Sequence, residues 1–188
     1  MTRLDPTPGQ TVGPFFHYAL PFVGDSDLVP RGHADSIRLH GLVLDGEGVP
    51  IPDALVEIWQ AAPDGTVPQA PGSLHRDGWT FTGWGRSATD GSGRYSFTTL
   101  TPGATEAGSA PFFAVTILAR GLLDRLFTRA YLPEHPAHAD DPLLRTVDPD
   151  RRPTLIAAAD DMGYRFDVHL QGADETVFLT YLGHGAAD

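Results

Sequence analysis

The stretch that decides the fold runs from Ala54-Leu-Val-Glu-Ile-Trp-Gln60 through Gly83-Trp-Gly-Arg86 and Arg94-Tyr-Ser-Phe97 to Thr101-Pro-Gly103. Its apolar runs are short, rich in aromatic and β-branched residues, and separated by glycine and proline turn signals. Runs of this length and composition predict β-strands rather than helices. Strand-like runs occur along the chain at about 36–44, 54–60, 79–84, 94–100, 112–120 and 125–132.

The composition of the whole chain also favours an all-β domain. Its 188 residues suffice for one domain, and 21 glycines with 17 prolines are too many for a helical bundle. Thirteen basic and 24 acidic residues give a net charge of −11, which argues against a nucleic-acid or anionic-membrane partner. Cysteine and lysine are absent, which excludes disulfides, cysteine nucleophiles and Schiff-base lysines.

The ends of the chain differ from its centre. Residues 1–35 are irregular, because prolines break helices and strands there while aromatic residues recur between them, so this arm must pack against something. Residues 36–188 predict a single β-sandwich of mostly antiparallel strands. The amino terminus lacks the layout of a signal peptide and no apolar run is long enough to span a bilayer, so we expect a cytoplasmic protein.

A long connection from about 133 to 163 interrupts the strands. It contains proline and aspartate clusters and two weak helical pieces, Asp141–Val147 and Pro153–Ala159. The chain then closes with two predicted strands, at 164–171 and 176–182, the first of which alternates apolar and polar residues cleanly.

The densest cluster of possible metal ligands is His135-Pro-Ala-His138, followed by Asp140 and Asp141. A run of small, acidic and proline residues describes a solvated loop better than a rigid metal site. The two aspartates have no apolar pocket predicted around them, so we do not expect them to act as general acids or bases.

Two other features allow a binding role. Gly13 and Pro14, within Thr11-Val-Gly-Pro-Phe-Phe16, permit close approach of a ligand to the backbone, although an arm that only pads the surface has the same pattern. Arg129 falls on the same strand face as Phe127 and Tyr131. A guanidinium among aromatic rings can hold a planar carboxylate, and an ordinary structural ion pair is the open alternative.

In combination, these elements resemble the intradiol ring-cleaving dioxygenases, non-haem ferric enzymes that open catechol rings between the two hydroxyls. The resemblance spans nearly the whole chain. Its elements are Gly41-Leu-Val-Leu-Asp-Gly46, Val56-Glu-Ile-Trp-Gln60, Gly83-Trp-Gly-Arg86, Thr89-Asp-Gly-Ser-Gly-Arg-Tyr-Ser-Phe97 and Thr101-Pro-Gly103. Further elements are Gln10-Thr-Val-Gly-Pro14, Ala119-Arg-Gly121, Thr128-Arg129, Arg151-Arg152, Thr154-Leu-Ile156, Tyr164-Arg-Phe-Asp167 and Glu175-Thr-Val-Phe178.

The resemblance is strongest to members of the family in which an α chain pairs with an iron-bearing β chain to cleave a small aromatic acid with O₂. It implies that the arm, residues 1–35, packs on the β chain. It also places Thr11, Gly13 and Pro14 in the substrate pocket wall and Arg129 near the carboxylate of the acid. Phe15 stands where a tyrosine is common in the family, which changes any contact that depends on that hydroxyl.

Catalytic members of the family hold Fe(III) with two tyrosines and two histidines. The matching positions of this chain carry Val67, Thr105, Phe113 and Val115. Ferric iron prefers phenolate, imidazole or carboxylate ligands, and these four side chains supply at best one poor oxygen donor. The resemblance therefore implies a chain with no catalytic residues of its own, inactive alone, whose Fe(III) cofactor is bound by the β chain.

Two other readings of the same sequence stay open. The chain is a stand-alone β-sandwich binding module that has kept the frame of the family without its catalysis, or an enzyme with a relocated metal site at His135 and His138. The iron content of the chain and its co-purification with a related chain distinguish these readings.

Overall fold

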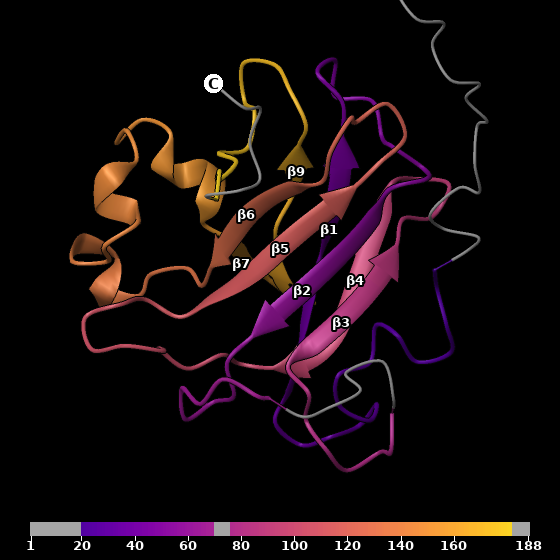
Figure 1. The fold of residues 1–188 in the computed structure, drawn as a ribbon, viewed down its shortest axis with the longest axis vertical. Coiled ribbons are helices and arrows are strands. Elements are labelled where there is room, and N and C mark those ends of the chain that lie inside the picture. The colour runs from indigo at the N-terminus through magenta and orange to yellow at the C-terminus, as the bar shows by residue number, and fades with distance from the viewer. Residues whose placement is uncertain (1–19, 70–75, 182–188) are drawn as a thin grey trace, which may run out of the picture.

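The computed structural model describes residues 20–69 and 76–181, which form two β-sheets packed face to face (Figure 1). The first sheet has the order β4-β1-β8-β7, with β9 also paired to β1, and the second has the order β3-β2-β5-β6. The first contains β1 (Ser36–Leu44), β4 (Arg94–Leu100), β7 (Ala158–Asp160), β8 (Gly163–Arg165) and β9 (Val168–His169). The second contains β2 (Leu55–Gln60), β3 (Trp84–Ala88), β5 (Phe112–Leu118) and β6 (Leu126–Tyr131). The predicted β-sandwich of mostly antiparallel strands is confirmed.

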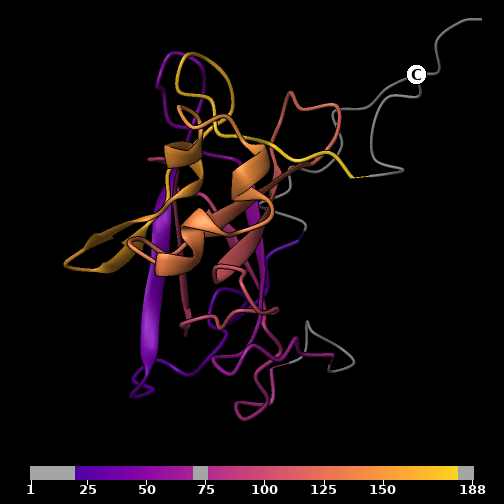
Figure 2. The same ribbon diagram turned by 90° about the vertical axis from the view of Figure 1, so that its left-hand side faces the viewer.

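The main core lies between the two sheets, which Figure 2 shows from the side as two layers. Leu39 and Phe97 enter it from the first sheet, and Ile58, Phe113 and Val115 enter it from the second. Each of these side chains is at most 2% exposed. Burying a side chain of this size stabilises the fold by about 1.5–3 kcal/mol, so apolar contact between the sheets dominates the stability of the sandwich.

Three short 3₁₀ helices lie beside β6 in the predicted long connection (Figure 1). They are η1 (Pro136–Ala139), η2 (Leu144–Thr146) and η3 (Arg152–Leu155). Leu144, Leu155 and Tyr131 of β6 bury each other in a second apolar cluster. The predicted helical pieces were therefore too long, and the end of the second is strand β7, whose backbone pairs with β8. No helix in the described ranges is both long and apolar enough to cross a membrane.

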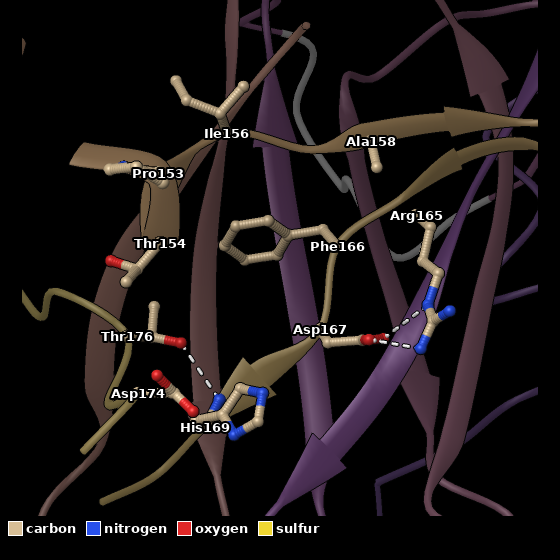
Figure 3. A pocket seen from close by; sticks show the side chains of 10 residues that line it. All are labelled: Pro153, Thr154, Ile156, Ala158, Arg165, Phe166, Asp167, His169, Asp174 and Thr176. Atoms are coloured by element: carbon tan, nitrogen blue, oxygen red, sulfur yellow. Dashed lines mark hydrogen bonds and ion pairs between the residues drawn. The ribbon is translucent and has the colours of Figure 1, made fainter. Parts of the chain in front are cut away.

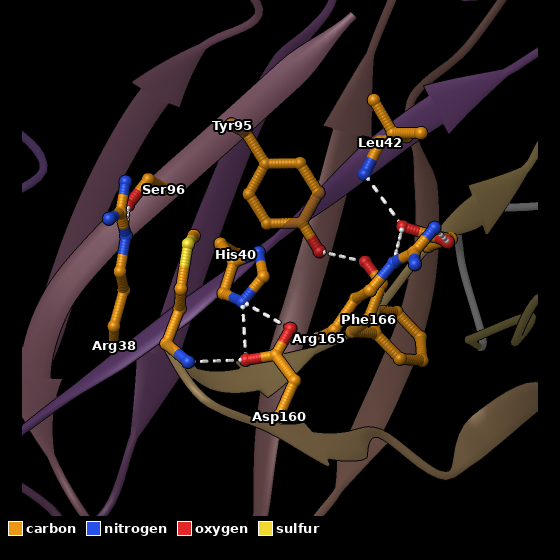
Figure 4. A network of polar contacts seen from close by, with 10 residues as sticks. Arg38, His40, Leu42, Tyr95, Ser96, Asp160, Arg165 and Phe166 are labelled. Carbon is orange, nitrogen blue, oxygen red and sulfur yellow. Dashed lines mark hydrogen bonds and ion pairs between the residues drawn. The ribbon is translucent and has the colours of Figure 1, made fainter.

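The predicted strand at 164–171 is interrupted at Phe166 and Asp167, which separate β8 from β9 (Figure 4). Side chains replace part of the strand ladder there: the carboxylate of Asp167 accepts the Leu42 amide at 2.9 Å, and the Tyr95 hydroxyl donates to the Phe166 carbonyl. The Phe166 amide still donates to the His40 carbonyl of β1 at 2.8 Å. Gly41 of β1 makes this possible, because a Cβ at that position would overlap the Phe166 carbonyl oxygen.

Two other predicted strands are wrong. The run at 79–84 is mostly a loop, because the Asp77 carboxylate accepts the amides of Trp79 at 2.8 Å and Thr80 at 2.7 Å, and Trp79 is 93% exposed. Strand β3 starts only at Trp84. Residues 176–181 contain no strand either.

The described part of the predicted arm, residues 20–35, packs on the sandwich of its own chain. Leu28 is only 4% exposed within the main core, and its amide donates to the Thr98 carbonyl at 2.8 Å. Phe22 stacks on Trp84 with 6.3 Å between ring centroids. The packing of residues 1–19 on another chain stays a prediction, since they lie outside the described residues.

Candidate functional site

The four positions matched to iron ligands lie in two different surroundings. Val67 is 51% exposed in the loop after β2, and Thr105 is exposed in the loop after β4. Phe113 and Val115 lie on the inner face of β5 and are 0% and 2% exposed. Two of the four positions therefore contribute to the main core.

The backbone nevertheless brings the two loops together. The Gly103 amide donates to the Ala62 carbonyl at 3.0 Å, and a Cβ at Gly65, where φ is +86°, would overlap the Ala104 carbonyl oxygen. Phe113 pairs in register with Gln60, the last residue of β2 before the first loop. The scaffold thus gathers both loops and the start of β5 at one end of the sandwich.

The side chains at this end do not fit Fe(III). Three of the four are hydrocarbon, and a threonine hydroxyl is a weak ligand for a hard ferric ion. Across residues 20–69 and 76–181, no group of three or more histidine, aspartate or glutamate side chains is placed to hold a metal.

The structure gives no support to a metal site at His135 and His138. His135 Nδ1 accepts the Ala137 amide at 3.2 Å and so begins η1, while the His138 ring packs edge-on against Tyr131. The Asp141 carboxylate is fully buried and already accepts four hydrogen bonds. The expectation that Asp141 lies in a solvated loop is therefore wrong.

Arg129 lies on the outer face of the second sheet, beside Tyr131 as the strand parity predicts. Its Cζ lies 3.9 Å from the centroid of the Phe112 ring, and its Nη1 donates to the Tyr131 hydroxyl at 3.1 Å. The Nε atom is buried and has no hydrogen-bond partner in the described structure. No carboxylate of the described residues forms an ion pair with Arg129, so the structure offers no support for the ordinary ion pair.

Tyr131 and Asp141 extend this cluster into the second apolar core. The Tyr131 hydroxyl donates to Asp141 Oδ1 at 3.0 Å, and the same carboxylate accepts the amides of Ala110, Leu143 and Leu144, each at 3.0 Å. Burial acts to raise the pKa of Asp141, but these hydrogen bonds outweigh it and lower the pKa below 3.8.

The sequence contained a signal for Asp141 that its interpretation as a loop missed. Asp-Pro before two leucines is typical of a residue whose side chain accepts the first amides of a helical turn, and the Asp141 carboxylate accepts the amides of Leu143 and Leu144, where η2 begins. Tyr131 was recognised only as a neighbour of Arg129. Its role as a link to a distant carboxylate depends on tertiary packing.

The predicted pocket residues Thr11, Gly13 and Pro14 lie outside the described residues. The described chain begins on the same sheet face as Arg129: the Leu20 carbonyl accepts from Arg86 at 2.8 Å, and Phe22 stacks on Trp84. Trp84, Trp59, Ala114 and Arg129 form one row across the four strands.

A separate pocket of about 480 Å³ opens between η3 and the segment from Arg165 to His169 (Figure 3). Arg165, which lines this pocket, forms an ion pair with Asp167 at 2.6 Å. This pairing compensates the positive charge within the pocket. Arg165 is therefore already paired with a carboxylate, whereas Arg129 has no such partner among the described residues.

Comparisons with known proteins agree with this geometry. The sequence model of a family described as "Dioxygenase" matches residues 25–172. The protocatechuate 3,4-dioxygenase alpha chain of Burkholderia cepacia is 39% identical over 197 residues, covering 95% of this chain and 99% of that one. The beta chain from the same organism is 32% identical, covering 83% of this chain and 78% of its own length. The dioxygenase domain of a dioxygenase carbohydrate-binding protein fusion from Streptomyces sp. SirexAA-E superposes with a TM-score of 0.58 at 26% identity, covering 90% of this chain and 100% of that domain.

Proposed function

This chain belongs to the intradiol dioxygenase family, and on that premise we propose that it is the α subunit of a heteromeric protocatechuate 3,4-dioxygenase. The complex inserts both atoms of O₂ into protocatechuate and forms 3-carboxy-cis,cis-muconate. The α subunit lines the substrate pocket, and a related β chain holds the iron. The observation that carries this proposal is the combination of an α-chain relative aligned over 95% of the sequence with ligand positions that have lost their donors.

The lack of strong metal-binding groups at the four matched positions supports placing the iron on the β chain. Phe113 and Val115 stand at the positions matched to the two histidine ligands. Both are hydrocarbon side chains packed in the main core, so they cannot bind a metal. The related β chain shares enough sequence to build the same scaffold beside this one. We place the complex in the cytoplasm.

The α subunit contributes orientation and charge rather than bond-making. Arg129 is a cation beside Phe112 with an unsatisfied N–H, in surroundings where charge is costly to bury without a partner. A benzoate-type carboxylate can compensate the charge by a charge-assisted hydrogen bond to an accessible N–H of the guanidinium. Thr11, Gly13 and Pro14 complete the pocket wall in this proposal.

Replacing Arg129 in the αβ complex tests the proposal. We expect Arg129→Ala to raise KM for protocatechuate about 10- to 100-fold, because it removes a hydrogen bond between charged groups. KM for catechol, which has no carboxylate, should change less than about twofold. Steady-state kinetics with both substrates measures the difference.

Arg125→Ala is the matched control, because it removes the same charge from an exposed arginine immediately before the same strand. It should leave the ratio of the two KM values as in the unmodified complex. Equal increases in both KM values for Arg129→Ala count against a carboxylate contact.

The second candidate, a stand-alone binding module, rests on the same loss of ligand donors. Purification from the native source separates the two functions. A complex with an iron-containing related chain supports the α subunit, whereas a homogeneous homo-oligomer without such a chain supports the binding module.

A further inference from the structure

The guanidinium of Arg129 is restrained on two sides by its own chain. Its plane is set by stacking on Phe112, with 3.9 Å between Cζ and the ring centroid. Its rotation is set by the hydrogen bond from Nη1 to the Tyr131 hydroxyl at 3.1 Å. The edge formed by Nε and Nη2 forms no hydrogen bond with the described residues, and Nε is buried. Because Nε is buried, Nη2 is the group left to donate to a carboxylate from outside the chain.

Tyr131 connects Arg129 to a fixed point in the protein. Its side chain is 0% exposed, and its hydroxyl accepts from Arg129 while donating to Asp141 Oδ1. Burial raises the pKa of Tyr131 to about 12, against the opposing influence of the Arg129 cation. The hydroxyl therefore keeps its proton at neutral pH, and the direction of both hydrogen bonds is constant.

Asp141 supplies the fixed point. It is 0% exposed, and its two oxygens accept three backbone amides, from Ala110 before β5 and from Leu143 and Leu144 after η1. A carboxylate bound to three amides cannot follow a rotation of the tyrosine. Because backbone groups hold Asp141, the orientation of the Tyr131 hydroxyl is determined by the fold itself.

We infer that Tyr131, anchored by Asp141, and Phe112 are positioning residues that hold the guanidinium of Arg129 so that its Nη2 group donates to the carboxylate of the aromatic acid. The inference rests on the proposed function, since it assigns the substrate carboxylate to one edge of Arg129. A free arginine side chain loses up to about 2 kcal/mol of rotamer freedom on binding, and restraint before binding reduces that loss.

A purely structural role for Tyr131 makes a different prediction. If Tyr131 only fills space beside Leu144 and Leu155, then loss of its hydroxyl affects stability and leaves substrate selection unchanged. If it positions Arg129, the loss affects the carboxylated substrate alone. The ratio of KM values for protocatechuate and catechol therefore separates the two roles.

The test uses Tyr131→Phe in the assembled αβ complex. We expect KM for protocatechuate to rise about fivefold to tenfold while kcat and KM for catechol stay within about twofold. In an Arg129→Ala background the same substitution should add less than about twofold, because the residue it positions is gone. Tyr95→Phe is the matched control: it removes a hydroxyl from a buried tyrosine of the other sheet and should leave both KM values unchanged.

Phe112→Leu provides a second variant, because Phe112 is only half-buried and tolerates the change if Tyr131→Phe fails to assemble. It removes the stacking surface and should raise KM for protocatechuate in the same direction. Dissociation constants of 4-hydroxybenzoate and phenol, which are not cleaved, provide a readout independent of turnover.

The outcomes separate the inference from the proposed function. If Arg129→Ala discriminates between the two substrates but Tyr131→Phe and Phe112→Leu do not, the positioning role is refuted and the α-subunit proposal stands. If Arg129→Ala itself does not discriminate between the two substrates, both the carboxylate contact and the positioning role are refuted. An equal rise of both KM values in Tyr131→Phe also overturns the positioning role.

Discussion

The end of the sandwich where the matched ligand positions gather and the outer face of the second sheet carry opposite kinds of side chain. At that end, Phe113 and Val115 of β5 occupy two of the positions matched to iron ligands and are part of the apolar main core. On the outer face, Arg129 and Tyr131 form a polar chain that ends at the buried carboxylate of Asp141. The proposal that this chain recognises the substrate and leaves iron binding to another chain rests on this difference.

The largest effect on stability is expected at the matched ligand positions in β5. Phe113→Ala should destabilise the chain by about 3–5 kcal/mol, because it leaves a cavity between the two sheets. Val67→Ala, at another matched ligand position but 51% exposed, should change stability by less than about 0.5 kcal/mol. Denaturant unfolding of the two variants measures the contrast, and similar losses would show that the matched ligand positions do not differ in packing as described.

A smaller effect is expected for the anchor of the outer cluster. Asp141→Asn turns one acceptor into a donor that faces a backbone amide, and should cost about 2–3 kcal/mol. The folded-state pKa of Asp141 is lowered, so its stabilisation is present above about pH 4 and is lost as pH falls through the lower folded value. Acid unfolding of the Asn variant should therefore depend less on pH below about pH 4 than that of the unmodified chain. An unchanged acid transition would mean that Asp141 is not held as described.

The next effect on stability is expected where the loop after β2 contacts the loop after β4. Gly65→Ala places a Cβ against the Ala104 carbonyl at a φ of +86° and should cost at least ~2 kcal/mol. Gly108 has a similar φ of +84° but open space around it, so Gly108→Ala should cost only about 1 kcal/mol. Thermal unfolding of both variants isolates the contribution of the loop contact, and equal losses would argue against it.

The smallest effect is expected on the alkaline side. The folded-state pKa of Tyr131 is raised from 10.0 to about 12, so its contribution to stability is complete below pH 10 and is lost as pH rises toward 12. Tyr131→Phe should reduce the loss of stability over that interval. Unfolding midpoints at pH 9 and pH 11 test this, and an identical pH dependence in both proteins would contradict it.

Sequence patterns predicted the sandwich and its family, because strand alternation and turn residues are local signals. They failed at Trp79, whose amide donates to the Asp77 carboxylate, and at Phe166, whose carbonyl accepts from the Tyr95 hydroxyl and not from a strand neighbour. Arg129 was identified from strand parity and from the family resemblance. Asp141 was missed because its burial depends on contacts with Ala110 and Tyr131, which are distant in sequence.

Iron content tests the central claim most directly. We predict one iron per αβ pair in the purified complex, and no stoichiometric iron or tyrosinate-to-iron absorption band in this chain purified alone. Two irons per pair, or stoichiometric iron with that band in the separate chain, would contradict it.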